Sequence, residues 1–279
     1  TYLGEDFHRA GGTAAVIGEL LRAGLLPHPD ALTVTGQTIA ELYTDTPILN
    51  DDVIRGVASP LKPNAGFLNM SGNLFDSALM KTSAIDAGFR ARYFSNAKEA
   101  FEGRVAVFDG PEDFHARIDD PALGLTDDSV LVMRGAGPKG YPGGAEVVNM
   151  RPPSYLIKKG VRALPCIGDG RQSGTSGSAS ILNASPEAAD GGGLALLQDG
   201  DPIRIDLKQR RVDVLLDETE LAARRTALDA TGGYAQPESQ SPWQEIFREK
   251  VRPFSEGMVF EGATEYRDIT NRGLPRNNH

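Results

Sequence analysis

The sequence predicts an α/β protein in which a helical segment precedes a mainly β domain. Apolar residues recur at helical spacing between Ala10 and Ala23. From Phe67 onward the apolar residues come instead in short runs bounded by Gly, Pro, Asp or Asn, which is typical of strands. Apolar and polar residues alternate from Ile203 to Leu207 and again from Val212 to Val214, on either side of a polar corner at 208–210, which predicts a β-hairpin with one buried face.

The N-terminal segment, residues 1–63, is expected to contain helix and linker. Ala14, Ile17 and Leu20 share one face of a helix that stops at Gly24. A second short helix is expected over Gly36–Leu42.

Turn residues in TDTPILNDD and SPLKPNAG interrupt any long element between Thr44 and Pro63. A domain boundary is therefore predicted there, and the second domain is taken as residues 64–279.

Four short apolar runs in the second domain predict strands, and a helix and a tail follow the hairpin. The runs are Phe67–Met70, Val105–Phe108, Val130–Met133 and Val161–Ile167. Asp217, with Glu220 three residues later, marks the start of a helix that ends at Gly232. The tail begins at Pro237.

The overall composition excludes several classes of protein. Thirty-eight acidic and twenty-nine basic residues give a net charge of −9, which disfavours nucleic acid as a partner. The single cysteine, Cys166, allows no internal disulfide and no zinc or iron–sulfur site held by cysteines of this chain. The lone cysteine also fits a reducing cytoplasm, where the protein is expected. No apolar run is long enough to span a bilayer, and the first residues have neither the basic nor the apolar region of a signal peptide. We also expect a homo-oligomer, either a dimer or a tetramer.

The stretch CIGDGRQSGTSGSASILNASPEAADGGGLAL, residues 166–196, is rich in glycine and serine and contains no histidine or lysine. It could bind phosphate, although it lacks the lysine of a P-loop. Ser173 could be a hydrolase nucleophile, but its surroundings do not read G-x-S-x-G. The glycines could also serve only tight turns and close packing.

A second glycine-rich stretch, MRGAGPKGYPGGAEVVNM, carries one acidic residue, Glu146. A carboxylate in such a loop is a suitable ligand for Mg²⁺, which takes one or two protein oxygens. Glu146 could equally be a solvated surface residue. The terminal His279 could reach a site or belong to a frayed end.

Four stretches carry a resemblance to a known family, in the same order and with similar spacing. They are FHRAGGTAAVIGELL, LNMSGNLFDSALMKTSAI, GAGPKGYPGGAE and DGRQSGTSGSASILNASPEAADGGGLALLQDGDPIRIDL. Together they closely resemble the C-terminal half of the dihydroxy-acid and sugar-acid dehydratases, from about Asp6 to about Glu218. GRQSGTSGS resembles the aldonate dehydratases more than the branched-chain dihydroxy-acid enzymes, which usually carry an aromatic residue where this chain has Gln172.

The resemblance implies a hydro-lyase that converts a 2,3-dihydroxy carboxylate into a 2-keto-3-deoxy acid. The substrate class is an aldonate such as arabinonate, xylonate, galactonate or gluconate, with the branched-chain dihydroxy acids as an alternative. The implied site residues are Ser173 as the base at C2, Thr175 beside it, and Glu146 as a Mg²⁺ ligand. A serine hydroxyl can act as a base near neutral pH only if nearby cationic charge lowers its pKa.

The resemblance also implies a β-barrel in the second domain and an iron–sulfur cluster, expected to be 2Fe-2S. The ligands of that cluster, further magnesium ligands and a modified lysine belong to an N-terminal half that the sequence does not contain. Residues 1–63 would then be the helical remnant of an N-terminal α/β domain. Cys166 matches no cluster ligand and is expected to be a buried strand residue.

On this basis the fragment alone is expected to be inactive, and the missing half becomes its partner. A hypothesis of another class is a binding or assembly module that keeps the barrel but has no chemistry of its own.

Overall fold

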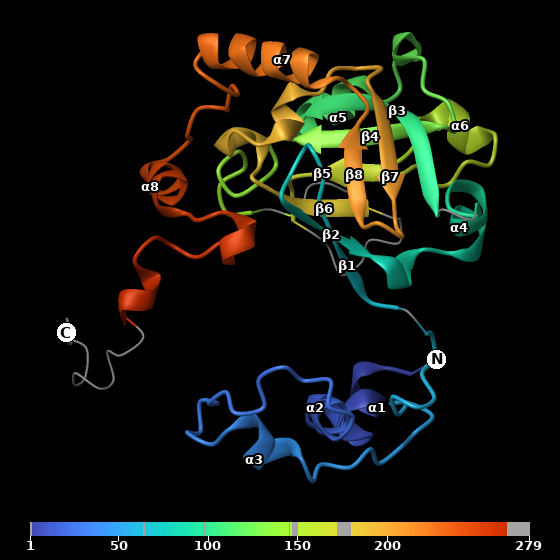
Figure 1. Ribbon diagram of the computed structural model, residues 1–279, viewed down its shortest axis with the longest axis vertical. Helices are drawn as coiled ribbons and strands as arrows, with labels where there is room; N and C mark the ends of the chain where they lie inside the picture. The colour runs from blue at the N-terminus through green and yellow to red at the C-terminus, as the bar shows by residue number, and fades with distance from the viewer. Residues whose placement is uncertain are drawn as a thin grey trace. The chain divides into compact units, whose positions relative to one another are not determined.

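The computed structural model describes residues 2–63, 65–96, 99–144, 146, 150–171 and 180–266. The chain divides into two compact units, Thr1–Ala65 and Gly66–His279. The first unit contains three helices, α1 (Gly4–Arg9), α2 (Gly12–Arg22) and α3 (Ile39–Tyr43), labelled in Figure 1.

Both helices predicted in the first unit are present. Helix α2 lies where the spacing of apolar residues places it. Helix α3 begins later than predicted because Thr38 caps it, its side chain accepting a hydrogen bond from the Glu41 amide at 3.1 Å. Gly36 instead has a φ of 80°, which belongs to a turn. Ala10, Ala15 and Ile54 form the buried centre of this unit.

The second unit is built on one sheet of eight strands that curls into a nearly closed barrel (Figure 1). The strands follow one another around the barrel in the order β1, β2, β6, β5, β4, β3, β7, β8. Their bounds are β1 (Phe67–Met70), β2 (Ser77–Lys81), β3 (Ala100–Asp109), β4 (Ser129–Arg134), β5 (Cys166–Gly168), β6 (Ser180–Ser185), β7 (Pro202–Asp206) and β8 (Arg211–Val214). The α/β class and the barrel are thus confirmed.

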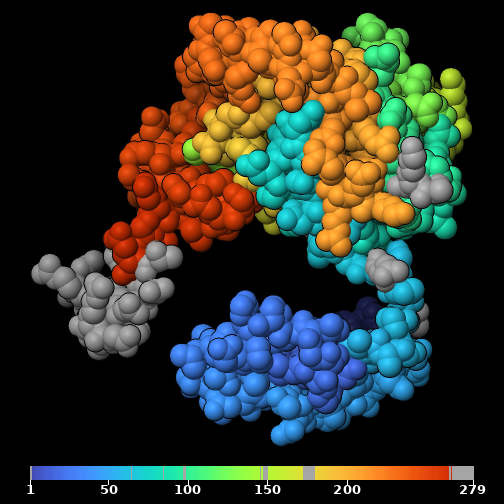
Figure 2. All heavy atoms as spheres, in the orientation of Figure 1, coloured from blue at the N-terminus to red at the C-terminus, as the bar shows by residue number. Residues whose placement is uncertain are grey.

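The barrel closes where the end of β1 meets β8. The Ser71 amide donates to the Arg210 carbonyl at 3.0 Å, and the Val212 amide donates to the Ser71 carbonyl at 2.8 Å. The Asn73 side chain bonds both backbone groups of Val214, each at 2.8 Å, and so substitutes for a strand residue. In Figure 2 the cyan surface of the β1–β2 segment lies beside the orange surface of the β7–β8 hairpin.

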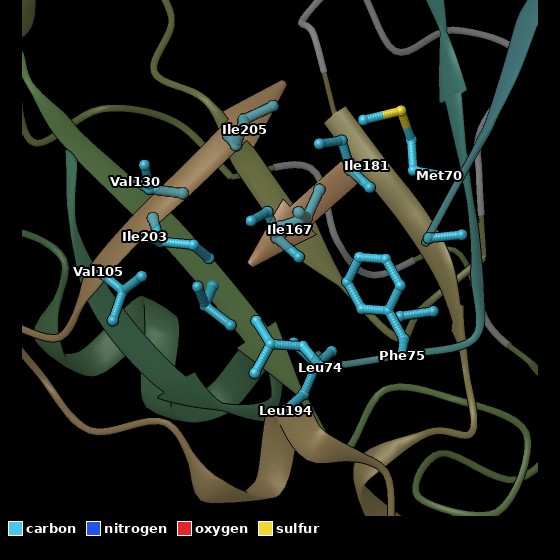
Figure 3. Packing of buried hydrophobic residues seen from close by; sticks show 14 of the residues in the cluster. Met70, Leu74, Phe75, Val105, Val130, Ile167, Ile181, Leu194, Ile203 and Ile205 are labelled. Atoms are coloured by element: carbon cyan, nitrogen blue, oxygen red, sulfur yellow. The ribbon is translucent and has the colours of Figure 1, made fainter. Parts of the chain in front are cut away.

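Side chains alternate between the inside of the barrel and its outer face. Val130 and Val132 of β4 belong to the inner cluster, whereas Leu131 and Met133 belong to the outer one. In Figure 3, side chains from β3 to β7 point toward the common interior. Because both faces of the central parallel strands are buried, β4 reads as a continuous apolar run in the sequence.

Among its described residues the second unit has five α-helices: α4 (Ala87–Tyr93), α5 (Gly110–Arg117), α6 (Ser154–Lys158), α7 (Glu218–Ala230) and α8 (Pro242–Lys250). Side chains of α5 and α6 pack in the outer cluster. Helix α7 is confirmed with its predicted cap, since Asp217 accepts a hydrogen bond from the Glu220 amide at 2.8 Å. Within the described part of the chain, no helix has the length and apolar character needed to cross a membrane.

The strand predictions need two corrections. The fifth strand begins at Cys166 and not at Val161, because Pro165 has no amide hydrogen to donate to a neighbouring strand. Strands β2 and β6 were not predicted. β6 lies inside the glycine- and serine-rich stretch, where the surrounding turn residues suggested loops alone.

Candidate active site

Four neighbouring strands, β3 to β6, run parallel and therefore end on the same side of the sheet. Their last residues are Asp109, Arg134, Gly168 and Ser185, and we call this side the carboxyl edge. Ligands of parallel sheets commonly bind beyond the carboxyl ends of the strands. Both glycine-rich stretches of the sequence leave the sheet here.

Asp109 and Arg134 pair at the ends of β3 and β4. The Arg134 Nε donates to Asp109 Oδ1 at 2.6 Å, and the Tyr234 hydroxyl donates to the same oxygen at 2.9 Å. Burial alone raises the pKa of Asp109, but Arg134 and Tyr234 outweigh this and hold it below its usual value. The Asp109 carboxylate is therefore a fixed negative charge.

A pocket of about 540 Å³ opens beside this pair. Its lining includes Asp109, Tyr234, Tyr141 of the first glycine-rich stretch and Arg248 of α8. The Arg248 Nε donates to the Lys139 carbonyl at 2.9 Å. The chain after α7 thus folds back over the carboxyl edge.

Asp169, directly after β5, is fully buried. Its carboxylate accepts hydrogen bonds from the amides of Gly135 (3.0 Å), Ala136 (2.9 Å) and Ala188 (2.9 Å). Burial raises the pKa of Asp169, and these three hydrogen bonds oppose that shift. The side chain connects the loops that follow β4, β5 and β6.

Glu187, just after β6, is the second buried carboxylate at the carboxyl edge, with 2 % of its surface exposed. It accepts hydrogen bonds from the amides of Lys139 at 2.7 Å and Gly140 at 3.0 Å. Burial raises the pKa of Glu187 to about 7, although the two amides act in the opposite direction. The nearby carboxylates of Asp169 and Asp190 raise the pKa further.

Two positions in the loop after β4 have no room for a side chain, which explains why they are glycines. A Cβ on Gly137 would lie 2.4 Å from Glu187 Oε2. A Cβ on Gly140 would lie 2.5 Å from the Gly135 carbonyl oxygen. The backbone can approach the buried carboxylate this closely only without side chains.

Glu146 and Arg171 bring the two glycine-rich stretches together. The Arg171 Nε donates to the Gly144 carbonyl at 3.0 Å, and its guanidinium lies 3.4 Å from Glu146 Oε2. About a third of the Glu146 side chain is exposed, so its carboxylate is accessible to solvent. The side chain of Met258, in the tail, lies against Gly144. A Cβ added to Gly144 would be 2.6 Å from the Met258 Cε atom.

We expect the stability of the protein to fall as pH rises from about 4.5 to about 7, because of Glu187. The pKa of this carboxyl rises from 4.5 to about 7 on folding, so in that range the folded state binds more protons than the unfolded state. At 1.36 kcal/mol per pH unit, the effect is on the order of 3 kcal/mol.

The Glu187→Gln variant tests this expectation through urea unfolding at pH 5, 6, 7 and 8. The variant should be less stable at pH 5, since a carboxamide satisfies only one of the two amides, at a cost of about 1–3 kcal/mol. Its stability should nevertheless change less with pH. Parallel pH curves for the two proteins would contradict the assignment.

Comparison with known proteins identifies the family. Residues 52–258 match the model of the dihydroxy-acid/6-phosphogluconate dehydratase C-terminal domain. The chain belongs to this family. Residues 1–42 match the N-terminal domain model of the same dehydratases.

Individual dehydratases align along most or all of the chain. The D-xylonate dehydratase of Caulobacter vibrioides is 52 % identical over 280 aligned positions, which cover 100 % of this chain and 46 % of that protein. The L-arabinonate dehydratase of Rhizobium leguminosarum bv. trifolii is 39 % identical over 80 % of this chain and 37 % of its own length. The dihydroxy-acid dehydratase of Pyrococcus furiosus is 40 % identical over 79 % and 38 %. The chain therefore spans less than half the length of these curated relatives.

The structure describes only some of the residues that the sequence offered as site candidates. Ser173, Thr175 and His279 lie outside the described residues. Glu146 lies at the carboxyl edge beside Arg171, two residues before Ser173 in the chain.

Cys166 is confirmed as a buried strand residue. It is fully buried at the start of β5, and its thiol donates to the Leu164 carbonyl at 3.3 Å. Burial raises the pKa of Cys166 to about 12. The thiolate that a metal or cluster requires is therefore strongly disfavoured at this position.

The sequence interpretation missed Asp169 and Glu187 as site residues. Asp169 directly follows β5, and Glu187 stands two residues after the end of β6. Both stand in stretches with few other charges, CIGDG and NASPEAAD. An acidic residue in such surroundings is a candidate buried acceptor of backbone hydrogen bonds.

Proposed function

We propose that this chain is the base-bearing part of a hydro-lyase that dehydrates a sugar acid to a 2-keto-3-deoxy acid. The observation that carries the proposal is the 52 % identity to a D-xylonate dehydratase along the whole chain. The dihydroxy-acid dehydratase of Pyrococcus furiosus is 40 % identical over 79 % of the chain, so we favour an aldonate over a branched-chain dihydroxy acid.

Ser173 is proposed as the base that removes the proton from C2 of the substrate. Its Oγ, as an alkoxide, accepts that proton while the C2–H electron pair forms the C2–C3 double bond. The C3–O bond breaks and the hydroxide takes up one proton to leave as water. Ser173 then gives up the proton that it accepted from C2, which balances the proton that the leaving group gained and restores the alkoxide. The enol that remains is converted to the 2-keto acid by transfer of its hydroxyl proton to C3. Thr175, in the same histidine-free stretch, is proposed to lie beside this base.

Glu146 suits the role of a Mg²⁺ ligand. Mg²⁺ commonly takes one or two carboxylates and fills its other positions with water or substrate, so a single partly exposed carboxylate is a sufficient contribution from this chain. The described residues contain no group of three or more His, Cys, Asp and Glu side chains that could hold a metal alone. A bound Mg²⁺ would supply Lewis acidity, stabilising negative charge that develops on oxygen.

The remaining parts are proposed to come from outside this chain. The buried Cys166 does not suit an iron–sulfur cluster, so a cluster, proposed as 2Fe-2S, would need ligands from the N-terminal half found in the longer relatives. We propose that this half is the partner of the chain, that the whole protein forms a homo-oligomer, and that it acts in the cytoplasm, where a free thiol stays reduced.

The test of the function is a panel of acids given to the whole protein. Arabinonate, xylonate, galactonate, gluconate and one branched-chain 2,3-dihydroxy acid are each followed for keto-acid formation. We expect turnover of at least one aldonate at a higher kcat/KM than the branched-chain acid. Turnover of none of them would instead support a binding or assembly module that keeps the dehydratase barrel.

The Glu146→Gln variant of the whole protein should require more Mg²⁺. Loss of the carboxylate should raise the Mg²⁺ concentration for half-maximal activity by at least about tenfold. Glu102→Gln is the control, since Glu102 is an exposed glutamate near the start of β3, away from the carboxyl edge, where it pairs with Arg204. An unchanged Mg²⁺ requirement in the Glu146 variant would remove this residue from the site.

A further inference from the structure

Asp169 and Glu187 hold one loop from two sides. Asp169 accepts from the amides of Gly135 and Ala136, and Glu187 accepts from those of Lys139 and Gly140. Asp169 follows β5 and Glu187 follows β6, whereas the loop follows β4. We call these two buried carboxylates and the loop segment 135–140 the carboxylate clasp.

The clasp binds backbone and not a cation. Among the ion pairs of the described residues, Lys139 pairs with Asp190 and Arg134 pairs with Asp109, and neither Asp169 nor Glu187 takes part in one. Burying a carboxylate without a cationic partner is unfavourable, and apolar side chains of similar volume usually stabilise an interior better. Overall stability therefore does not account for the two acids, whereas a fixed backbone conformation does.

The clasped loop leads directly to the proposed metal ligand. Beyond Gly140 the chain continues to Gly144, whose carbonyl accepts from Arg171, and to Glu146, which pairs with the same arginine. Asp169 stands two residues before Arg171 and four before Ser173. One fully buried side chain thus joins the loop that carries Glu146 to the segment that leads to Ser173.

We propose that Asp169 and Glu187 are positioning residues, which set the place of Glu146 relative to Arg171 by fixing the backbone of residues 135–140. This inference rests on the proposed function for the role of Glu146. The carboxylate clasp itself rests only on the hydrogen bonds. The clasp and the proposed function can therefore be tested separately.

The first measurement is amide hydrogen exchange in the whole protein, by mass spectrometry with residue-resolving fragmentation. Because the carboxamide keeps one acceptor oxygen, Glu187→Gln should speed exchange by at least about tenfold at one or both of Lys139 and Gly140, and leave Gly135 and Ala136 close to wild type. Asp169→Asn should speed exchange at one or both of Gly135 and Ala136 and leave Lys139 and Gly140 close to wild type. If Asp169→Asn does not fold, Glu187→Gln and Glu187→Asp carry the test. Unchanged exchange at Lys139 and Gly140 would overturn the clasp.

The second measurement is Mn²⁺ binding to the metal-free protein, with Mg²⁺ as competitor. Residues that orient a metal ligand typically change metal affinity by about 10- to 100-fold. We therefore expect Glu187→Gln to bind Mn²⁺ at least tenfold more weakly. Asp201→Asn is the matched control, because Asp201 is also buried but pairs with Arg224 of α7. The control should lose stability and keep its Mn²⁺ affinity.

The Glu146→Gln variant distinguishes a failure of the metal assignment from a failure of the positioning role. If it binds Mn²⁺ as the wild type does, the metal assignment in the proposed function is wrong, and the exchange pattern alone decides the clasp. If Glu146→Gln loses affinity but Glu187→Gln does not, the positioning role is overturned. It is also overturned if Asp201→Asn loses as much affinity as Glu187→Gln.

Discussion

Replacing Ser173 with alanine in the whole protein is expected to lower sugar-acid turnover by about two to four powers of ten, the usual contribution of a positioned base. The loss should fall on kcat, because the alanine variant lacks the hydroxyl oxygen that we propose receives the C2 proton. Substrate binding and Mg²⁺ affinity should change little. Steady-state kinetics on the preferred aldonate, with KM and kcat determined separately, measure this effect.

Ser178→Ala is the matched control for the Ser173 variant, since Ser178 belongs to the same glycine-rich segment. It should retain turnover within a few-fold of the wild type. Turnover near the original level in the Ser173 variant would show that another group removes the proton. The next candidate would then be the neighbouring Thr175 or a residue of the N-terminal half.

Replacing Gly72 with alanine should destabilise the barrel strongly. A Cβ there would lie 1.7 Å from the Val212 carbonyl oxygen, so β8 would have to move away from the end of β1. The neighbouring hydrogen bonds of Ser71 with Arg210 and Val212, which close the barrel, would be strained or lost. Overpacking against backbone typically costs about 1–3 kcal/mol, and this contact places the expected loss at about 3 kcal/mol or more.

Urea unfolding and thermal melting measure the Gly72 effect. A loss of about 3 kcal/mol in a unit of this size lowers the melting temperature by roughly 6–12 °C. Gly4→Ala is the control, because no atom lies within 4 Å of its added Cβ. The control should stay within about 0.5 kcal/mol of the wild type. Equal stability of both variants would contradict the described closure.

The parts of the fold that could be predicted are those with a local pattern. The β7–β8 hairpin shows alternation because one of its faces is buried, and α7 shows both its cap and its glycine stop. Strand β6 has no such pattern, since both its faces are buried and its neighbours are turn residues. The closure of the barrel at Ser71 joins residues about 140 positions apart, so no local sequence pattern predicts that contact.

The candidate site likewise has residues that the local sequence indicates and contacts that depend on residues far apart in the chain. Glu146 could be selected because it is the one acid in a glycine-rich stretch, and because of the resemblance to the dehydratases. Its approach to Arg171 spans 25 positions and depends on the pairing of β4 with β5. Asp169 and Glu187 accept hydrogen bonds from amides of a loop more than 30 positions away. Residue types alone could therefore not predict the role of these two acids.

The deep burial of Cys166 has a practical consequence for labelling experiments. Its protonated thiol should react very slowly with maleimides, because the reactive thiolate is scarce near neutral pH and the sulfur is shielded from solvent. A cysteine introduced at an exposed position of this chain would then accept a fluorophore or spin label without prior removal of the native one. Distances measured from such a probe would refer to a single point on the barrel.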